Sequence, residues 1–237
     1  MIFLWGLAGD RPMASVREEL VRIGRSAILL DQRAVLETAV EFLADKDIAC
    51  TVTWGGVTLD LGSVTAAYVR PYDPYGVPSV RETPPDSAAR RHAASVYEAL
   101  RLWGDATPAR VVNRLGSMGS NASKPYQMEM IRAAGFLVPT TLVTTDPEGA
   151  RAFCAEHGDV VYKSVSGARS IVARVTEARR AELDHVAACP TQFQAYVPGT
   201  DYRVHVVGDD AFVCELASAA DDYRYAERQG ADVVRRP

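Results

Sequence analysis

The stretch Gln194-Ala-Tyr-Val-Pro-Gly-Thr-Asp-Tyr-Arg-Val-His-Val-Val-Gly208 decides how this chain is interpreted. It predicts two strands, Gln192 to Val197 and Tyr202 to Val207, because β-branched and aromatic residues lie on either side of a Pro-Gly break. The segment around the break would join one sheet to the next and offer its backbone N–H and C=O groups to a ligand. Asp201 and Arg203 fall on one face of the second strand, because side chains alternate along a strand.

Two lysines precede this stretch in settings that suit anion binding. Of the 26 basic residues, only Lys46, Lys124 and Lys163 are lysines, whose compact charge suits a phosphate oxygen. Lys124 follows a Gly/Ser/Asn loop at the start of a predicted helix, where backbone N–H groups and the helix dipole favour an anion. Lys163 closes a predicted strand and precedes the turn Ser164-Val-Ser-Gly-Ala168, a layout that can cover phosphates.

From Val112 to about Arg224, the sequence resembles the ATP-grasp family in its RimK-like branch, with most likeness to the graspetide (microviridin-type) peptide-maturing ligases. The segments that carry the resemblance are Asn113-Arg-Leu-Gly, Lys124-Pro-Tyr-Gln-Met, Gly135-Phe-Leu-Val-Pro-Thr-Thr-Leu-Val143, Val161-Tyr-Lys-Ser164, Gln194-Ala-Tyr-Val-Pro-Gly199, Asp201-Tyr-Arg-Val-His-Val-Val-Gly208 and Asp222-Tyr-Arg224. The N-terminal part is similar to the preATP-grasp domain only in its general pattern of predicted strands and helices.

The resemblance implies an α/β fold in which a Rossmann-like preATP-grasp domain (residues 1–108) precedes an ATP-grasp nucleotide-binding domain (residues 109–237). Such enzymes phosphorylate a carboxylate with MgATP and then let an amine or hydroxyl attack the acyl phosphate. ATP and Mg²⁺ are therefore the expected cofactors, and a small-molecule or peptide carboxylate is the expected substrate. Pairing of such enzymes is common in the family, so the resemblance also carries the expectation of a homo-oligomer.

The resemblance also assigns roles to individual residues. Lys124 and Lys163 would hold the ATP phosphates, Gln194, Ala195, Tyr196 and Val197 would hold the adenine, and Asp201 would meet the ribose. Arg203 and Arg224 would be the catalytic residues, which neutralise charge on the transferring phosphoryl group and on the tetrahedral intermediate. Ala195 stands where relatives often carry Glu, which is compatible with recognition by backbone atoms.

The magnesium ligands are the part of the family pattern that does not match. The family has an acidic residue, then a Glu and an Asn, in strands beyond the Asp-Tyr-Arg motif, whereas this chain ends at Pro237. Glu215, Asp221 and Asp222 are the nearby carboxylates, but none occupies that motif. No metal ligand is assigned, and the ATP-grasp domain is expected to be truncated at its C-terminus. A site completed by another polypeptide and a non-catalytic nucleotide- or peptide-binding module are the alternatives.

The first half of the chain predicts a β-α-β opening and hence a parallel sheet. Ile2 to Trp5 and Ala27 to Leu30 are typical of buried strands. Between them, a capping box at Ser15-Val-Arg-Glu18 would begin a helix that Gly24 ends. The opening also admits a Rossmann-type oxidoreductase or transferase, but Gly6-Leu-Ala-Gly-Asp10 lacks the glycine fingerprint for a pyrophosphate.

The remaining predicted elements follow from periodicity and turn residues. They are a hairpin at 50–61 around Gly55-Gly56, strands at 64–69, 110–113, 141–144, 160–163, 170–174 and 211–216, and helices at 87–103, 125–134, 147–156 with Asp146 as cap, and 178–187.

Composition and charge argue against several classes of protein. Lys+Arg is 26 and Asp+Glu is 30, and a net charge of -4 does not suit a nucleic-acid binder that depends on a general basic field. The four cysteines are scattered without a CxxC pair, which predicts neither a zinc site nor a disulfide framework. The first apolar run lacks a basic flank and no stretch reaches membrane-spanning length, so we expect a cytoplasmic chain with no membrane partner.

Overall fold

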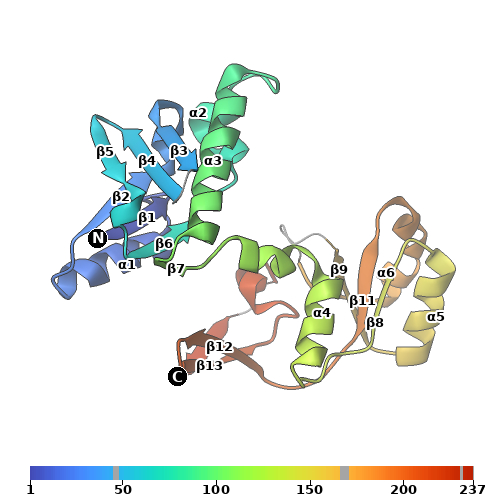
Figure 1. Cartoon of the computed structure of the whole chain (residues 1–237). Coiled ribbons are helices and arrows are strands. Elements are labelled where there is room, and N and C mark those ends of the chain that lie inside the picture. The colour runs from blue at the N-terminus through green and yellow to red at the C-terminus, as the bar shows by residue number, and fades with distance from the viewer. Residues whose placement is uncertain (45–47, 166–170, 230–231, 237) are drawn as a thin grey trace. The chain divides into compact units, whose positions relative to one another are not determined.

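The computed structural model describes residues 1–44, 48–165, 171–229 and 232–236, and it divides into two compact units, Met1–Gly119 and Ser120–Pro237 (Figure 1). The boundary expected from the sequence lies earlier, between residues 108 and 109. The later division follows from β7 (Arg110–Val112), which pairs in parallel with β6 (Ala66–Arg70) and so extends the sheet of the first unit.

A parallel sheet of four strands, in the order β2-β1-β6-β7, forms the centre of the first unit. β1 (Ile2–Gly6) lies between β2 (Ala27–Asp31) and β6, which confirms the predicted β-α-β opening. The long helix α3 (Ala88–Ala106) begins at its cap Ser87, as predicted, and Figure 1 shows it alongside the strands. Its buried residues join those of β1 in one core, in which the Trp103 ring meets Phe3 edge-on. The short helix α2 (Pro78–Arg81) precedes it.

Helix α1 (Arg11–Arg22) begins before the capping box that was predicted to start it. Asp10 is the N-cap residue, and Pro12 occupies the first turn, where its missing N–H would have had no partner in any case. Ser15 therefore lies inside the helix, and the predicted start was wrong. The predicted end is confirmed, because Gly24 adopts a φ of 68° just beyond the last turn.

A small antiparallel sheet, in the order β3-β4-β5, adjoins the core of the first unit. The predicted hairpin is confirmed as β4 (Ile48–Trp54) and β5 (Val57–Asp60). Gly55 and Gly56 connect the two strands with φ values of 51° and 78°, as a two-residue turn with two positive φ angles requires. The third strand, β3 (Ala39–Ala44), was not anticipated.

Gly6 allows the ends of β1 and β6 to approach closely. A Cβ at Gly6 would lie 2.5 Å from the carbonyl oxygen of Arg70 and 2.9 Å from the Cε atom of Met13. The strand ends would have to separate, so we expect Gly6→Ala to lower the free energy of unfolding by about 1–3 kcal/mol. Urea denaturation followed by tryptophan fluorescence measures this, because all three tryptophans lie in the first unit. Gly9→Ala is the control, since nothing lies within 4 Å of its Cβ, and equal losses in the two variants would contradict the steric reason.

The second unit contains two antiparallel sheets, in the orders β10-β9-β11-β8 and β12-β13-β14. Their strands are β8 (Thr141–Thr144), β9 (Val160–Ser164), β10 (Ala173–Arg174), β11 (Thr191–Ala195), β12 (Asp201–Val207), β13 (Asp210–Ser218) and β14 (Val233–Arg236). Helix α5 (Pro147–His157) covers one face of the first sheet and shares a core with it, and Asp146 caps this helix as predicted. Helix α4 (Lys124–Ala133) begins the unit, close to its predicted position. β14 was not anticipated.

The helix predicted at 178–187 is wrong as a single element. The structure has a short helix α6 (Glu177–Arg180) and then a 3-10 segment, Leu183–Ala188. Leu183 and Val186 are the buried residues of that segment, and their spacing of three suits the tighter helix. Of the strand predicted at 170–174, only β10 is present, and residue 170 lies outside the described residues. Within the described ranges, no helix is long and apolar enough to cross a membrane.

Candidate functional site

Lys163 is the central residue of the candidate site. It lies on β9, partly buried, and no described residue forms a hydrogen bond or ion pair with its ammonium. Burial, and then the nearby charges of Lys124 and Arg224, lower the pKa of Lys163, while Asp222 acts weakly in the opposite direction. Three cations with one carboxylate among them repel one another, and a negatively charged ligand would remove that repulsion.

Lys124 connects the start of α4 to the turn that follows β9. The hydroxyl of Ser123 caps the helix, so that Lys124 occupies its first position. The ammonium of Lys124 donates hydrogen bonds to the carbonyl oxygens of Ser164 and Val165, at 3.0 and 3.3 Å. Burial and the charge of Arg224 lower the pKa of Lys124. The part of this turn predicted to cover phosphates, residues 166–168, lies outside the described residues.

Arg224 is oriented by Asp222, which is 5% exposed. The guanidinium donates from Nη2 to Oδ2 at 2.6 Å and from Nε to Oδ1 at 2.8 Å. Asp222 also accepts from the backbone N–H of Val172, just before β10, at 3.2 Å. Burial alone would raise the pKa of Asp222, but these hydrogen bonds outweigh it and hold the pKa below its usual value. Asp222 therefore fixes the direction of Arg224 and attaches its segment to the sheet.

We expect Asp222→Asn to lower the free energy of unfolding by about 1–3 kcal/mol at neutral pH, because the amide cannot accept the same charge-assisted bonds. Since the folded-state pKa lies below the unfolded-state value, this contribution is complete above the unfolded-state pKa. It is lost as the pH falls through the folded-state pKa. Denaturation followed by circular dichroism across that acidic range measures the difference. Asp184→Asn is the control, because Asp184 is an exposed partner of Arg151. A pH-independent difference would contradict the linkage.

The two predicted catalytic arginines line one cavity. β12 carries Asp201 and Arg203 on one face, as the period of two predicted, although both side chains are exposed. Arg203 and Arg224 border a cavity of about 980 Å³, together with Arg235 of β14. Arg235 was missed by the sequence reasoning. It lies in β14, a strand that was not anticipated, and the structure aligns both Arg235 and Asp201 with Leu216 of β13, which places them on one face of the sheet.

Two backbone donors of the segment that joins the two sheets are already engaged. The N–H groups of Ala195 and Tyr196 already donate to carbonyl oxygens of neighbouring loops, at 3.0 and 2.9 Å. The side-chain amide of Gln194 donates to the hydroxyl of Thr141 at 3.0 Å. Val197 N–H pairs with no group in the described part of the chain. It is therefore one backbone donor of this segment that remains for a ligand.

Arg174 links this segment to the loop before Arg224. Its guanidinium carbon lies 3.6 Å from the centroid of the Tyr196 ring, and its Nε donates to Asp221 at 2.9 Å. The backbone N–H of Arg174 also donates to Asp221, at 3.2 Å. The joining segment, β10 and the arginine-bearing loop are thus connected by one side chain.

An unsatisfied polar atom adjoins Lys163. Gln192 lies directly opposite Lys163 in the ladder of β9 and β11 and has no exposed surface. Its Oε1 atom accepts no hydrogen bond from the described residues, and its Nε2 lies 3.7 Å from the sulfur of Met128. Buried acceptors are rarely left unpaired, so a polar ligand or water at this face would complete the site.

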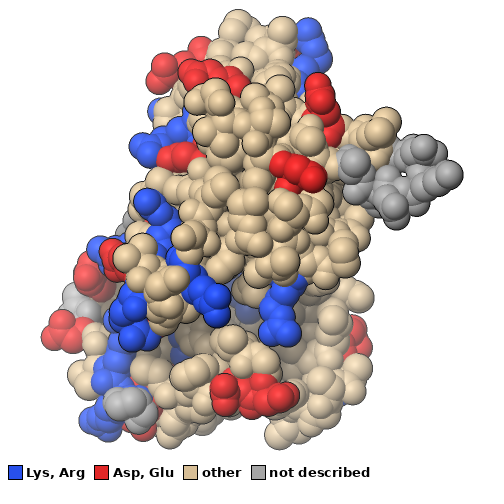
Figure 2. Space-filling model, turned by 60° about the vertical axis from the view of Figure 1, so that its left-hand side comes forward, with Lys and Arg blue, Asp and Glu red and all other residues tan. Residues whose placement is uncertain are grey.

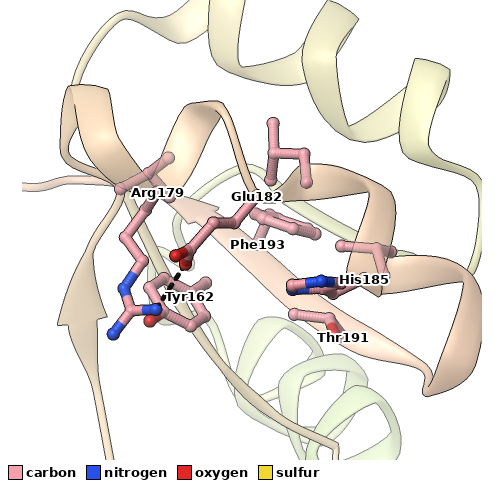
Figure 3. Close-up of a pocket in the computed structure, with 9 residues that line it drawn as sticks. Tyr162, Arg179, Glu182, His185, Thr191 and Phe193 are labelled. Carbon is pink, nitrogen blue, oxygen red and sulfur yellow. Dashed lines mark hydrogen bonds and ion pairs between the residues drawn. The ribbon is translucent and has the colours of Figure 1, made fainter.

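The opposite face of the same sheet holds a different cavity, of about 160 Å³ (Figure 3). Tyr162 and Phe193 form its apolar floor and belong to the core beneath α5. Figure 3 shows Arg179 and Glu182 paired at its edge. Because Tyr162 and Lys163 are consecutive in a strand, their side chains point to opposite faces. This cavity is therefore separate from the cations around Lys163.

The carboxylates nearest to the arginines are each paired with one of them: Asp222 with Arg224, Asp221 with Arg174, and Glu215 with Arg236. Among the residues the structure describes, no group of three or more His, Cys, Asp or Glu side chains could hold a metal ion. These residues do not form a magnesium ligand set. Figure 2 shows both basic and acidic side chains on one face of the molecule, and neither sign covers that face.

Solved structures match the chain over nearly its full length. A RiPP-associated ATP-grasp ligase from Chryseobacterium gregarium, solved with ADP and a leader and core peptide, is 20% identical with a TM-score of 0.77, over 100% of this chain and 77% of that one. The macrocyclase MdnC from Microcystis aeruginosa, bound with a precursor peptide, is 22% identical with a TM-score of 0.72, over 90% and 74% of the two chains. The ATP-grasp ligase PsnB, complexed with minimal precursor, Mg and ADP, is 29% identical with a TM-score of 0.71, over 91% and 71%.

These matches confirm the resemblance to the RiPP-associated ATP-grasp ligases at the level of structure, and the fold is an α/β ATP-grasp-like one. No family model matches the chain. A search of curated proteins also returns no match.

Proposed function

We propose that this chain binds ATP at the face that carries Lys163 and is an ATP-dependent carboxylate–amine or carboxylate–hydroxyl ligase acting on a peptide. The observation that carries the proposal is the ammonium of Lys163, which is partly buried, near Lys124 and Arg224, and without an acceptor among the described residues. Support comes from the structural neighbours, which were solved with ADP and with leader, core or precursor peptides.

Each part of a nucleotide would have a partner among these residues. Lys163 and Lys124 would hold the phosphates, because an ammonium is a compact donor for their oxygens. Val197 N–H would meet the edge of the adenine, and Asp201 would meet the ribose. The unpaired Oε1 atom of Gln192 agrees with a polar group being bound at this face.

ATP, when bound, supplies the phosphoryl group that converts a carboxylate into an acyl phosphate. Arg203 and Arg224 would neutralise negative charge as that group moves and as the nucleophile adds to the carbonyl carbon. Asp222 fixes the guanidinium of Arg224 beforehand, so little reorganisation is needed during the reaction. Mg was present in the PsnB structure, but the carboxylates described in this chain form no ligand set for it.

Nucleotide binding without turnover is the second candidate. Asp221 and Asp222 are already paired with arginines, which leaves neither carboxylate free to act as a base in this arrangement. In this case the chain would bind ATP with the same residues but would not activate a carboxylate.

Calorimetric titration of the chain with a non-hydrolysable ATP analogue, with and without magnesium, tests the proposal. We expect saturable binding, and a folded chain that binds no nucleotide would overturn both candidates. The second step is to measure ADP and phosphate release from ATP with an acidic peptide that also carries Lys, Ser and Thr. Release that depends on the peptide, together with loss of water from the peptide mass, supports the ligase. Binding without either product supports the second candidate.

A further inference from the structure

The first unit contains a cavity of its own at the carboxyl ends of its parallel strands. It has a volume of about 240 Å³ and is bordered by Asp10, Arg70, Tyr72 and Asn113, with Leu7 and Met118 as apolar walls. Arg70 is the last residue of β6, and Asn113 follows β7 directly. In open α/β sheets this edge is where ligands bind, because several loops diverge there.

Asp10 fixes Arg70 through its Nε atom, and the terminal nitrogens Nη1 and Nη2 remain available to a ligand. Asp10 accepts from the Nε atom of Arg70 at 2.5 Å, and its side chain does not cap α1 although Asp10 is the N-cap residue of that helix. No described group accepts a hydrogen bond from Nη1 or Nη2 of Arg70. The ion pair also raises the pKa of Arg70, so the guanidinium stays charged. A guanidinium fixed through Nε presents its two terminal nitrogens as a fork that fits a carboxylate.

Hydrogen bonds and close packing hold the backbone beside Arg70. The buried amide of Gln32 exchanges two hydrogen bonds of 2.6 Å with the backbone of Tyr72, which fixes the loop after β6. Gly6 holds the end of β1 against the carbonyl of Arg70, where a Cβ would not fit. A site with fixed donors loses little conformational entropy when it binds a ligand.

We propose that this cavity is a recognition subsite for an acidic side chain of the peptide substrate, with the carboxylate bound by Nη1 and Nη2 of Arg70. This inference rests on the proposed peptide ligase and extends it to the substrate. The volume is below the roughly 300 Å³ at which pockets for drug-sized ligands begin, so one side chain fits better than a whole small substrate. Leu7 and Met118 would pack against the methylene groups of a glutamate, and Asn113 adds an amide donor.

The test uses the full chain without nucleotide, so that it does not depend on the site in the second unit. Three peptides of one length are titrated into ¹⁵N-labelled protein: an acetylated and amidated peptide with three glutamates, the same peptide with glutamines, and the glutamine peptide with a free C-terminal carboxylate. The side-chain amide signal of Asn113 and the backbone signal of Tyr72 report binding. We expect saturable shifts with the glutamate peptide alone. Equal shifts with the glutamine peptide, or shifts only with the free C-terminus, would overturn the assignment.

Variants of Arg70 and Asp10 test whether this ion pair binds the glutamate peptide. Arg70→Gln is expected to weaken binding of the glutamate peptide at least tenfold, and Arg70→Lys is expected not to restore it, because an ammonium lacks the fork. Asp10→Asn should weaken it less, since the guanidinium remains but is no longer fixed. Arg33→Gln is the matched control, because Arg33 forms a similar exposed pair with Asp31 in the same unit but does not line the cavity.

Tryptophan fluorescence, which reports on the first unit, verifies that each variant is folded. Unchanged peptide binding by folded Arg70→Gln would overturn the inference. A failure of nucleotide binding in the second unit would overturn the proposed ligase and leave these titrations interpretable, so the two failures are distinguishable.

Discussion

Replacing Lys163 with methionine is expected to weaken binding of a non-hydrolysable ATP analogue by about 100-fold. A hydrogen bond to a charged group contributes about 1.5–3 kcal/mol, and each 1.4 kcal/mol is a factor of ten in affinity. The effect should lie near the upper end of that range, because Lys163 is partly buried and no described residue would take over its role. Methionine keeps the length and the apolar stem of the side chain, so the loss reports the charge.

The same substitution should stabilise the chain in the absence of nucleotide. The folded state lowers the pKa of Lys163, first by burial and then through Lys124 and Arg224, so the charged form is less favourable there than in the unfolded chain. Between the folded-state and unfolded-state pKa values, the unfolded chain binds more protons, and the stability of the natural chain rises with pH. The gain in free energy of unfolding from Lys163→Met is therefore largest below the folded-state pKa. This gain disappears as the pH approaches the pKa of lysine in the unfolded chain.

Calorimetric titration and urea denaturation together distinguish a binding residue from a structural one. A structural lysine would lose stability and affinity together, whereas Lys163→Met should lose affinity and gain stability. Arg132→Gln is the control, because Arg132 is an exposed partner of Glu129 on α4 in the same unit. Nucleotide affinity equal to that of the natural chain would remove the main support for the nucleotide site.

Local patterns predicted many of the elements correctly, because their signals act over a few residues. Asp146 and Pro147 start α5, and Gly55-Gly56 turns the hairpin, through backbone preferences that are visible in the sequence. The start of α1 was wrong because two signals competed. Ser15 and Glu18 match a capping box, but Pro12 already suits the first turn of a helix that begins earlier.

The arrangement of the site residues was harder to predict than the local elements, because it depends on contacts between segments that are distant in the sequence. Lys124 and Lys163 were predicted as phosphate ligands from residue type and setting, and the charge of Lys124 helps to lower the pKa of Lys163 in the structure. Gln194 was predicted to meet an adenine through its backbone, which stays a prediction, and its side-chain amide is paired with Thr141 of β8. Arg174 contacts Tyr196 and Asp221 and so joins three segments. These residues are far apart in the sequence, so no local sequence pattern predicts the contacts.

The second large effect is expected at the arginines of the cavity in the second unit. If the chain is a ligase, Arg203→Gln and Arg224→Gln should each lower the rate of ADP formation at saturating nucleotide and peptide by about 100- to 1,000-fold. That range is the usual cost of losing one donor aimed at charge that develops in the transition state. Nucleotide affinity should change by only a few-fold, because Lys124 and Lys163 remain.

Arg224→Lys distinguishes charge from geometry at this position. Arg224 meets Asp222 through two parallel hydrogen bonds, and a lysine cannot reproduce both while directing its charge to the same point. We therefore expect Arg224→Lys to lose most of the rate although the charge is kept, and Asp222→Asn to lose part of it with Arg224 still present. Rapid-quench measurement of a single turnover reports the chemical step directly.

Arg236→Gln is the matched control for these variants. Arg236 follows Arg235 in β14, so its side chain lies on the other face of the sheet, where it pairs with Glu215. If Arg236→Gln lost as much rate as Arg203→Gln, the effect would reflect general damage to the sheet. If the arginine variants lost nucleotide affinity in proportion to rate, they would be binding residues rather than catalytic ones. A rate loss confined to Arg203 and Arg224, with affinity retained, is the result that only stabilisation of the transition state explains.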